Sequence, residues 1–392
     1  MPTYHANEWA LQFLKVKEAW ALTLPNPPDS KSQGEGIIIA HPDTGWTEHP
    51  ELIKGNRYIT DPAISKSFFG RFAPHLTAED TLSGMHPSHG TTTASLMLSD
   101  EGHPSQNPPN NNYPSYTVPT SDFVTGIAPK AEVIPLRVSD TVALGSGHTS
   151  MHGQPVNTYR TVTEAIYHAL SLNNDLVGVI SISLGGLRMP SYLEQALIRA
   201  RQRGVIVCCA AGQAFNTRGS VGPAAPGRSV HALSIAGCPQ NESQPTEGFY
   251  GPEVDLTTPG WGVMVARTTG NVPRFTAPNP PRNFVIDPNG DGTSYSTALT
   301  AGACALWQAF HGRLNLIRTF GRPLLTDVFR HCLSGSVRKP TGWDNLNRGM
   351  GILDVEALLL QPLPSLNTAE VVANSNSWPE SARGNSSEWG RE

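Results

Sequence analysis

Short runs of apolar residues alternate with amphipathic segments along most of the chain. Two of the amphipathic segments begin with capping-box sequences, Thr161-Val-Thr-Glu164 and Ser191-Tyr-Leu-Glu194, which predict helix starts. Alternating strands and helices indicate a parallel sheet covered by helices on both faces, with functional groups at the carboxyl ends of the strands. The apolar runs have the length and composition of buried strands, and we expect strands at 36–40, 132–138, 177–184, 205–210 and 232–237.

The first twenty residues have the pattern of a short amphipathic helix. Trp9, Phe13, Val16 and Trp20 recur at helical spacing after Asn7, a suitable N-cap residue. The segment lacks the basic start, apolar run and cleavage site of a signal peptide. No stretch approaches the ~18 consecutive apolar residues that a membrane-spanning helix needs. We therefore expect no membrane partner.

Two segments rich in proline and asparagine interrupt this rhythm. Residues 103–120 and residues 271–290 each hold five Pro and four Asn. Because strand and helix patterning resumes after each of them, we expect surface loops inserted into one domain that spans residues 1–362. Residues 363–392 are rich in Ser, Asn, Glu and Gly without periodicity, which predicts a disordered tail.

Charge and cysteine content narrow the classes of function. The chain has 28 basic and 32 acidic residues and a formal net charge of −4, so it lacks the basic field of a nucleic-acid-binding protein. Its five cysteines show neither metal-site nor paired spacing. We expect them to be small buried residues of a protein in a reducing, cytoplasmic compartment. Oligomeric state is left open.

Three segments each place a chemically active side chain at the end of a strand or the start of a helix. Asp43 ends an apolar strand, His89 opens a helical segment, and Ser294 follows a glycine-rich turn at the start of an apolar helix. A serine hydroxyl becomes a nucleophile when an imidazole takes its proton and a carboxylate orients that imidazole. Singly, such residues are usually caps, turn residues or satisfied polar groups. Together they predict nucleophilic catalysis by a serine.

The motifs around these residues resemble those of the subtilisin-like serine proteases, the subtilases. Asp43-Thr-Gly45, His89-Gly-Thr91 and Gly292-Thr-Ser294 are similar to the three catalytic motifs of that family and occur in its order. The resemblance extends from about residue 7 to residue 360 and implies an α/β fold of three layers with a mostly parallel central sheet. Connecting segments are also similar, at 126–129, 183–186, 210–212, 223–226, 258–260 and 343–354.

The resemblance implies a role for each of these positions. Asp43 would orient the base, His89 would act as general base and then acid, and Ser294 would form an acyl-enzyme with a protein or peptide substrate. An extended peptide would add as a strand along residues 183–186. Gly222 would lie near the base of the specificity pocket, where no charge is evident, so an apolar or aromatic residue is expected before the scissile bond. The implied substrate-binding residues are Ser183, Leu184, Gly185, Gly186, Ala210, Ala211, Gly212 and Gly222.

The chain departs from the family pattern at the residue that donates to the oxyanion. The family usually has Asn after Ala-Ala-Gly, whereas this chain has Gln213, with Asn216 as a substitute three residues later. Gln carries the same amide on a side chain that is one methylene longer and loses more rotamer freedom. Loss of such a donor costs about 10²–10³ in kcat.

The resemblance requires no organic cofactor. Calcium sites are frequent in the family, and Glu48, Glu51 and the loop 287–291 are the acidic positions here, although Asp/Asn/Gly loops are mostly plain turns. Two alternatives stay open beside a serine endopeptidase. One is a pseudoprotease that binds peptides or a partner, with Gln213 marking relaxed catalytic selection. The other is an acyl-transferring enzyme that makes cyclic peptides, with the insert 103–120 as a lid.

Overall fold

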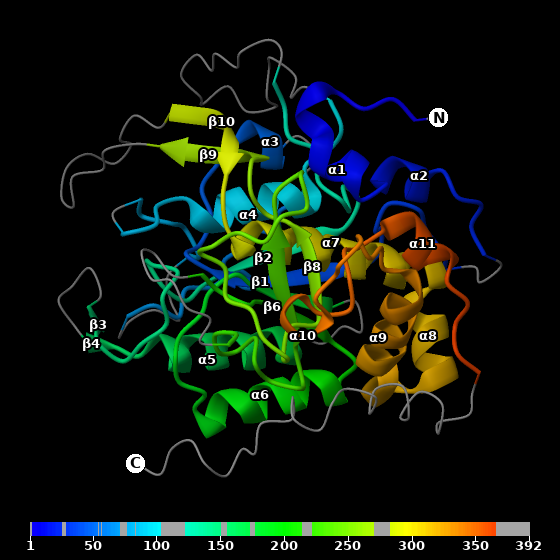
Figure 1. The fold of residues 1–392 in the computed structure, drawn as a ribbon. Helices are drawn as coiled ribbons and strands as arrows, with labels where there is room; N and C mark the ends of the chain where they lie inside the picture. The colour runs from blue at the N-terminus through cyan, green and yellow to red at the C-terminus, as the bar shows by residue number, and fades with distance from the viewer. Residues whose placement is uncertain are drawn as a thin grey trace.

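The computed structural model describes most of the chain and shows an α/β fold of three layers (Figure 1). Asn216, the predicted insert at 103–120 and most of the predicted tail lie outside the described residues. The described ranges are 2–25, 29–53, 55, 57–70, 77–82, 84–102, 122–149, 155–172, 177–213, 222–269 and 283–365.

A six-stranded sheet forms the middle layer, and each pair of neighbouring strands in it is parallel. Its strand order is β2-β1-β5-β6-β7-β8, so the chain starts near one edge and crosses over between strands. Five of the six strands lie at the predicted apolar runs. The exception is β8, whose sequence Leu-Thr-Thr-Pro is too short and too polar to stand out. The strands are β1 (Ile38–Asp43), β2 (Glu132–Arg137), β5 (Val177–Ile182), β6 (Ile206–Ala210), β7 (Leu233–Cys238) and β8 (Leu256–Pro259).

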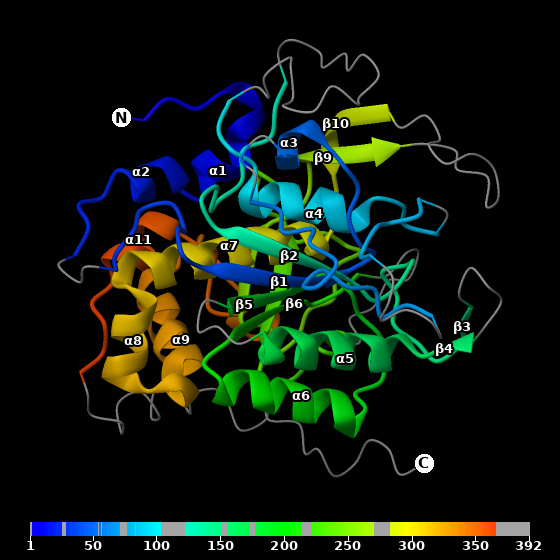
Figure 2. The same ribbon diagram turned by 180° about the vertical axis from the view of Figure 1, so that it is seen from behind.

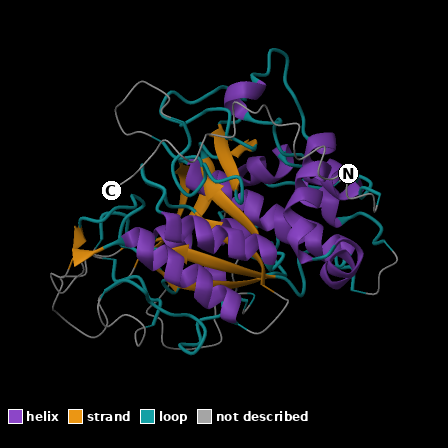
Figure 3. Ribbon diagram, turned by 90° about the horizontal axis from the view of Figure 1, so that it is seen from below, coloured by secondary structure: helices purple, strands orange, loops and turns teal. Residues whose placement is uncertain are grey.

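Helices cover both faces of this sheet, as the alternation of strands and helices predicted. Helices α5 (Thr158–Ser171) and α6 (Ser191–Gln202) pack on one face and share one apolar core with it. Helices α4 (His89–Leu98) and α7 (Thr293–His311) pack on the other face and share the larger core. Figure 2 shows the sheet between these two helix pairs. Figure 3, seen from below, shows the sheet behind α5 and α6.

Helix α7 runs through the larger core and is buried along almost its full length. Ser294, near its first turn, is the one residue of α7 that is not buried. The helix lies against strands β5, β6, β7 and β8, and its Trp307 is fully buried. A residue at the start of α7 is therefore held as firmly as the core itself.

Neither predicted capping box forms, although the helix start predicted at Ser191 is confirmed. Helix α5 begins three residues before Thr161, because the side chain of Asn157 accepts hydrogen bonds from the N–H groups of Tyr159 and Arg160 and caps the helix first. Ser191 is the first residue of α6 and does not cap it. The Glu194 carboxylate instead accepts a hydrogen bond from Ser229 Oγ.

The predicted N-terminal helix is divided into three short pieces. They are a 3₁₀ turn (Ala6–Glu8), α1 (Trp9–Phe13) and α2 (Val16–Trp20). Lys15 has a left-handed conformation with φ of 56°, which interrupts the helix. Asn7 is not a cap, and its side chain donates a hydrogen bond to Phe123 O.

These short helices are joined to the last described helix, α11 (Val355–Leu360). The N–H of Val355 donates to Leu14 O at 2.9 Å, and Lys15 Nζ lies 2.6 Å from Asp354 Oδ2. We call these two contacts the terminal clasp. Helices α8 (Arg313–Phe320), α9 (Leu325–Ser336) and α10 (Asn345–Arg348) lie between α7 and α11 in sequence.

Part of the second predicted loop is a strand. Strand β10 (Asn283–Gly290) pairs antiparallel with β9 (Val263–Thr269), so the expected loop at 271–290 is wrong for its last eight residues. Phe284, Val285 and Ile286 favour a strand, and the high proline count concealed this short apolar run. Three further short elements complete the described fold: a hairpin of β3 (His148–Thr149) with β4 (Pro155–Val156), helix α3 (Pro50–Ile53) and a 3₁₀ turn (Arg322–Leu324).

All five cysteines are buried and unpaired, as predicted. Cys208 Sγ and Cys304 Sγ approach each other to 3.6 Å in the core between β6 and α7. Among the described helices, none has the length and apolar character to cross a bilayer.

Candidate active site

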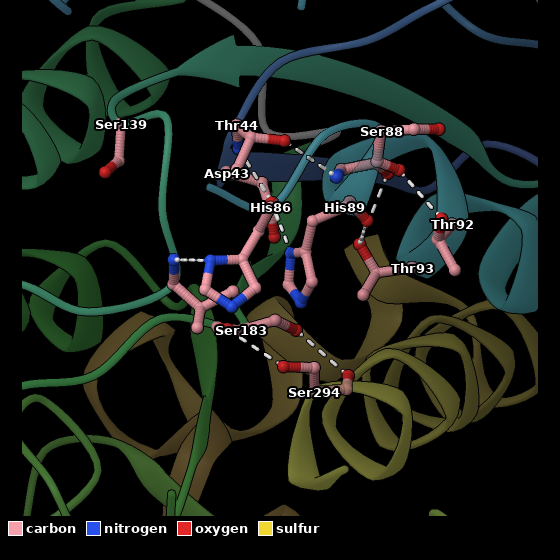
Figure 4. Close-up of polar contacts among 12 residues, drawn as sticks. Asp43, Thr44, His86, Ser88, His89, Thr92, Thr93, Ser139, Ser183 and Ser294 are labelled. Atoms are coloured by element: carbon pink, nitrogen blue, oxygen red, sulfur yellow. Dashed lines mark hydrogen bonds and ion pairs between the residues drawn. The ribbon is translucent and has the colours of Figure 1, made fainter. Parts of the chain in front are cut away.

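The three predicted catalytic residues come from three different elements. Asp43 is the last residue of β1, His89 is the first residue of α4, and Ser294 is the second residue of α7. The His89 ring lies between the other two side chains (Figure 4). His89 Nδ1 is 2.7 Å from Asp43 Oδ1, which is the distance of a strong charge-assisted hydrogen bond.

Asp43 is fully buried and held as a carboxylate. Its Oδ1 accepts hydrogen bonds from the N–H of Thr44 and from His89, both at 2.7 Å. Burial alone would raise its pKa. The charge of His89 and a side-chain interaction with His41 outweigh burial and hold the pKa of Asp43 below its ordinary value. An ionised Asp43 fixes the His89 tautomer with the proton on Nδ1 and leaves Nε2 free to accept a proton.

His41 is a site residue that the sequence analysis missed. It lies two residues before Asp43 on β1, so both side chains project from the same face of the strand. His41 Nε2 is 3.0 Å from Thr93 Oγ1 and 3.4 Å from Asp43 Oδ2. Thr93 Oγ1 donates to carbonyls in the first turn of α4 and so accepts from His41, which assigns the proton of His41 to Nε2. The signal in the sequence was a histidine within an otherwise apolar strand.

A buried network joins the end of β1 to the start of α4. Asp80 Oδ2 accepts hydrogen bonds from Thr44 Oγ1 at 3.0 Å and from the N–H of Ser88 at 2.7 Å. Thr44 Oγ1 in turn accepts from the N–H of Gly90 at 3.1 Å. A Cβ on Gly90 would lie 2.1 Å from Gly45 O, so only glycine lets the helix approach the strand this closely.

Ser294 and Ser183 exchange a pair of hydrogen bonds. Ser294 Oγ donates to Ser183 O at 3.1 Å, and Ser183 Oγ donates to Ser294 O at 3.0 Å (Figure 4). The hydroxyl proton of Ser294 therefore points to Ser183 in this structure. Catalytic hydrogen bonds are often formed only in the substrate complex.

Gln213 lies against the start of α7. Its Oε1 accepts a hydrogen bond from the N–H of Thr293 at 2.9 Å. Thr293 Oγ1 accepts one from the N–H of Gly212 at 3.2 Å, which fixes the turn on the other side. With Oε1 anchored beside the nucleophile, the Gln213 Nε2 has no hydrogen-bond partner within the described part of the chain. Its longer side chain is thus used to reach Thr293.

The predicted peptide-binding edge is already paired. The N–H of Gly185 donates to Val142 O at 3.0 Å, and Gly185 O accepts from the N–H of Leu144 at 2.8 Å. Gly186 exchanges two hydrogen bonds with Ala225, at 2.8 and 2.9 Å. Two long-range backbone contacts therefore use the hydrogen-bonding groups of Gly185 and Gly186 in this conformation, and the addition of a peptide along residues 183–186 stays a prediction.

The surroundings of the predicted specificity pocket also differ from expectation. A Cβ on Gly222 would have Glu253 Oε2 within 3.7 Å, so the expected absence of charge near Gly222 is wrong. Ala224 packs closely against Gly185 and Gly212. Its Cβ is 2.8 Å from the position that a Cβ on Gly185 would take and 3.1 Å from the position of one on Gly212. Leu184, Ala210 and Ala211 are buried.

Three of the four acidic residues considered for calcium have partners within the protein. Asp287 Oδ1 accepts from the N–H of Asn289, and its Oδ2 lies 3.2 Å from Arg267. Asp291 Oδ1 accepts from the N–H of Gly262, and Glu51 Oε2 accepts from the N–H of Val124. Within the described ranges, no group of three or more His, Cys, Asp or Glu is placed to hold a metal ion. Asp287, Asp291 and Glu51 therefore each have a hydrogen-bond partner within the protein.

Comparison with known proteins identifies the family. Residues 34–318 match the model of the subtilase family, Peptidase_S8. Thermitase of Thermoactinomyces vulgaris is 26% identical over 264 residues, which cover 66% of this chain and 72% of thermitase. An intracellular serine protease of Paenibacillus polymyxa is 25% identical over 287 residues, covering 71% of this chain and 68% of that protein.

Solved structures share the fold. MycP1 without its N-terminal propeptide superposes with a TM-score of 0.60 at 19% identity, covering 91% of this chain and 98% of MycP1. A protease of Pseudoalteromonas arctica gives a TM-score of 0.62 at 20% identity, covering 88% of this chain and 93% of that protease. The family match spans well over half of the chain, and the matched relatives are serine proteases that act on proteins or peptides. This chain belongs to the subtilase family of serine endopeptidases.

Proposed function

We propose that Asp43, His89 and Ser294 form the catalytic triad of this endopeptidase. The observation that carries the proposal is the 2.7 Å contact between His89 Nδ1 and the buried, ionised Asp43. It leaves His89 Nε2 as the base that faces Ser294, the one accessible residue of α7. On substrate binding the Ser294 hydroxyl would turn from Ser183 O to His89 Nε2.

The reaction follows from these positions. Ser294 Oγ attacks the peptide carbonyl while His89 Nε2 takes its proton, and His89 then gives that proton to the leaving amine. Water hydrolyses the acyl-enzyme by the same exchange in reverse. The backbone N–H of Ser294 at the start of α7 and the Gln213 Nε2 would donate to the oxyanion. The anchoring of Gln213 Oε1 on Thr293 supports this role, because it leaves the amide nitrogen as the available end.

A fluorophosphonate, which modifies activated serines, tests the triad. Intact mass should show one adduct on the parent protein and on Ser334→Ala, a control serine on the exposed face of α9, and none on Ser294→Ala. Circular dichroism of all three proteins checks the fold. If the folded parent takes up no adduct, the triad is not assembled and the pseudoprotease alternative replaces this proposal.

An apolar specificity pocket is a second part of the proposal. Ala224 and the buried Ala210 and Ala211 support it, whereas Glu253 near Gly222 is an acidic group that could favour a basic side chain. Anilide substrates with Leu, Phe, Lys or Arg before the scissile bond distinguish the two. We expect kcat/KM to be highest for Leu or Phe. A preference for Lys or Arg would show that Glu253 determines the specificity of the pocket.

Metal or cofactor requirement, acyl transfer and cellular location can each be tested directly. Hydrolysis should be unchanged by EDTA if neither metal nor cofactor is required. Cyclic or ligated products from a peptide substrate would indicate acyl transfer in place of hydrolysis. Five buried, unpaired thiols support a cytoplasmic location, which fractionation of the source cells would test.

A further inference from the structure

Residues 140–144, which follow β2, lie along the edge where a peptide was expected to bind. We call this segment the strap. Ala143 and Gly185 form a parallel bridge, with Val142 O accepting from Gly185 N and Leu144 N donating to Gly185 O. Both hydrogen-bonding groups of Gly185 are therefore occupied by the chain itself, at 3.0 and 2.8 Å. These distances are those of an ordinary sheet.

The strap is held from a second side by His86. Thr141 Oγ1 is 3.1 Å from His86 Nδ1, and the N–H of Val142 points to the same nitrogen at 3.4 Å. The N–H of His86 also donates to Asp140 O at 3.3 Å. Leu144 is 6% exposed and packs into the core shared by α5 and α6. The strap is thus an extended segment outside the regular strands that has hydrogen-bond partners on both sides.

We propose that the strap is a resident strand which an extended peptide substrate must displace, and that it determines which substrates the site accepts. This inference rests on the proposed function of the same site. A peptide that adds along residues 183–186 needs a donor and an acceptor from Gly185, and backbone groups that already form hydrogen bonds cannot form the same bonds with a peptide. Displacement replaces the hydrogen bonds of Gly185 to Val142 and Leu144 with equivalent hydrogen bonds of Gly185 to the peptide backbone.

The strap therefore separates substrates by length. A single-residue ester reaches Ser294 and the pocket without using Gly185, so the strap does not affect it. A tetrapeptide anilide extends along the edge and must compete with Val142 and Leu144. We expect weakening of the strap to lower KM for the tetrapeptide and to leave the ester unchanged.

The kinetic test uses one variant in the strap and one just outside it. Leu144→Pro removes the N–H that donates to Gly185 O. Gly147→Ala is the control, because a Cβ there would meet nothing within 4 Å and the strap keeps its hydrogen bonds. We expect Leu144→Pro to lower the tetrapeptide KM about fivefold, the size of one backbone hydrogen bond, with Gly147→Ala near the parent value. An unchanged or raised KM in Leu144→Pro, with the ester rate retained, would overturn the proposal.

Amide hydrogen exchange tests the displacement without any substitution. A tetrapeptide boronate that bonds to Ser294 should abolish protection of the Leu144 amide and preserve that of Gly185, because the peptide replaces Val142 O as acceptor. A small fluorophosphonate on Ser294 should leave both amides protected. Protection of Leu144 in the boronate complex would contradict displacement. Failure of the fluorophosphonate to label Ser294 would instead contradict the proposed function, so the two failures are distinct.

Discussion

His41 and His89 contact different oxygens of the same carboxylate: His41 Nε2 lies 3.4 Å from Asp43 Oδ2, and His89 Nδ1 lies 2.7 Å from Asp43 Oδ1. The buried Oδ2 has no hydrogen-bond partner of good geometry among the described residues. His41 is therefore the group that stabilises the negative charge on the second oxygen of Asp43. Its own position is set by Thr93 in the first turns of α4.

Replacing His41 should weaken the ability of Asp43 to stay ionised and to orient His89. His41→Leu removes the donor at comparable volume, which raises the pKa of Asp43 and lowers kcat/KM about tenfold, as expected for one hydrogen bond to a charged group. His41→Gln places an amide N–H near the position of Nε2 and should restore most of the rate. Carboxyl ¹³C NMR titration of Asp43 checks the cause. If both variants lose the same activity with no change in the Asp43 titration, His41 serves packing alone.

Gln213 should matter for kcat and little for KM. Gln213→Ala removes the side-chain donor for the oxyanion and should lower kcat about 10²–10³-fold. Gln213→Asn keeps an amide but is too short to retain the 2.9 Å contact with the N–H of Thr293, so we expect an intermediate rate. Steady-state kinetics on one peptide anilide compare the three proteins. A faster Asn variant would show that Gln213 is a poorly placed donor.

Gly90 should tolerate no side chain. In Gly90→Ala the new Cβ meets Gly45 O at 2.1 Å, which is backbone and cannot turn aside, so α4 must move away from β1. We expect a loss of roughly 2–3 kcal/mol in the free energy of unfolding and at least a hundredfold loss of kcat/KM, because His89 moves with the helix. Urea titration and kinetics measure both.

Gly147 offers the control for that substitution. A Cβ there would meet nothing within 4 Å. Gly147→Ala should therefore change neither the free energy of unfolding nor the rate. Equal losses in the two alanine variants would show that the close contact at Gly90 is not the cause.

Acid should destabilise the fold through His311. Burial against Trp307 and Phe310 lowers its pKa from 6.5 to about 4. The unfolded chain binds the proton first, so stability is complete above pH 6.5 and falls as the pH decreases towards 4. The difference corresponds to roughly 3 kcal/mol. Urea titrations at pH 7 and 4.5 should show a smaller pH dependence in His311→Leu, and an equal dependence would exclude His311 as the source.

The sequence was sufficient for the parts of the fold that depend on local pattern. Continuous apolar runs predicted β1, β2, β5, β6 and β7, because strands buried on both faces need apolar side chains at every position. The catalytic motifs could be read for the same local reason. Asp43, His89 and Ser294 each terminate or begin a regular element, and parallel strands bring their carboxyl ends to one edge.

The parts that could not be predicted depend on distant partners. The strap is joined to Gly185 across some forty residues, and no local pattern indicates which backbone groups meet. His41 resembled one more position in a buried strand until Thr93 and Asp43 were placed beside it. The start of α5 was missed because Asn157, and not Thr161, caps the helix. The Asn157 side chain accepts hydrogen bonds from two backbone N–H groups.

The terminal clasp has a consequence for the protein's resistance to its own activity. An endopeptidase in solution meets other copies of itself, and cleavage of a folded copy requires a stretch of chain to unfold locally and become extended. Frayed ends are the usual starting points. Here Leu14 and Lys15 are fastened to Val355 and Asp354, so neither the first nor the last described helix can detach without breaking its contacts with the other. The clasp therefore joins the helices at both ends of the described chain, and we expect the part of the molecule that it holds together to be the last that self-digestion cuts.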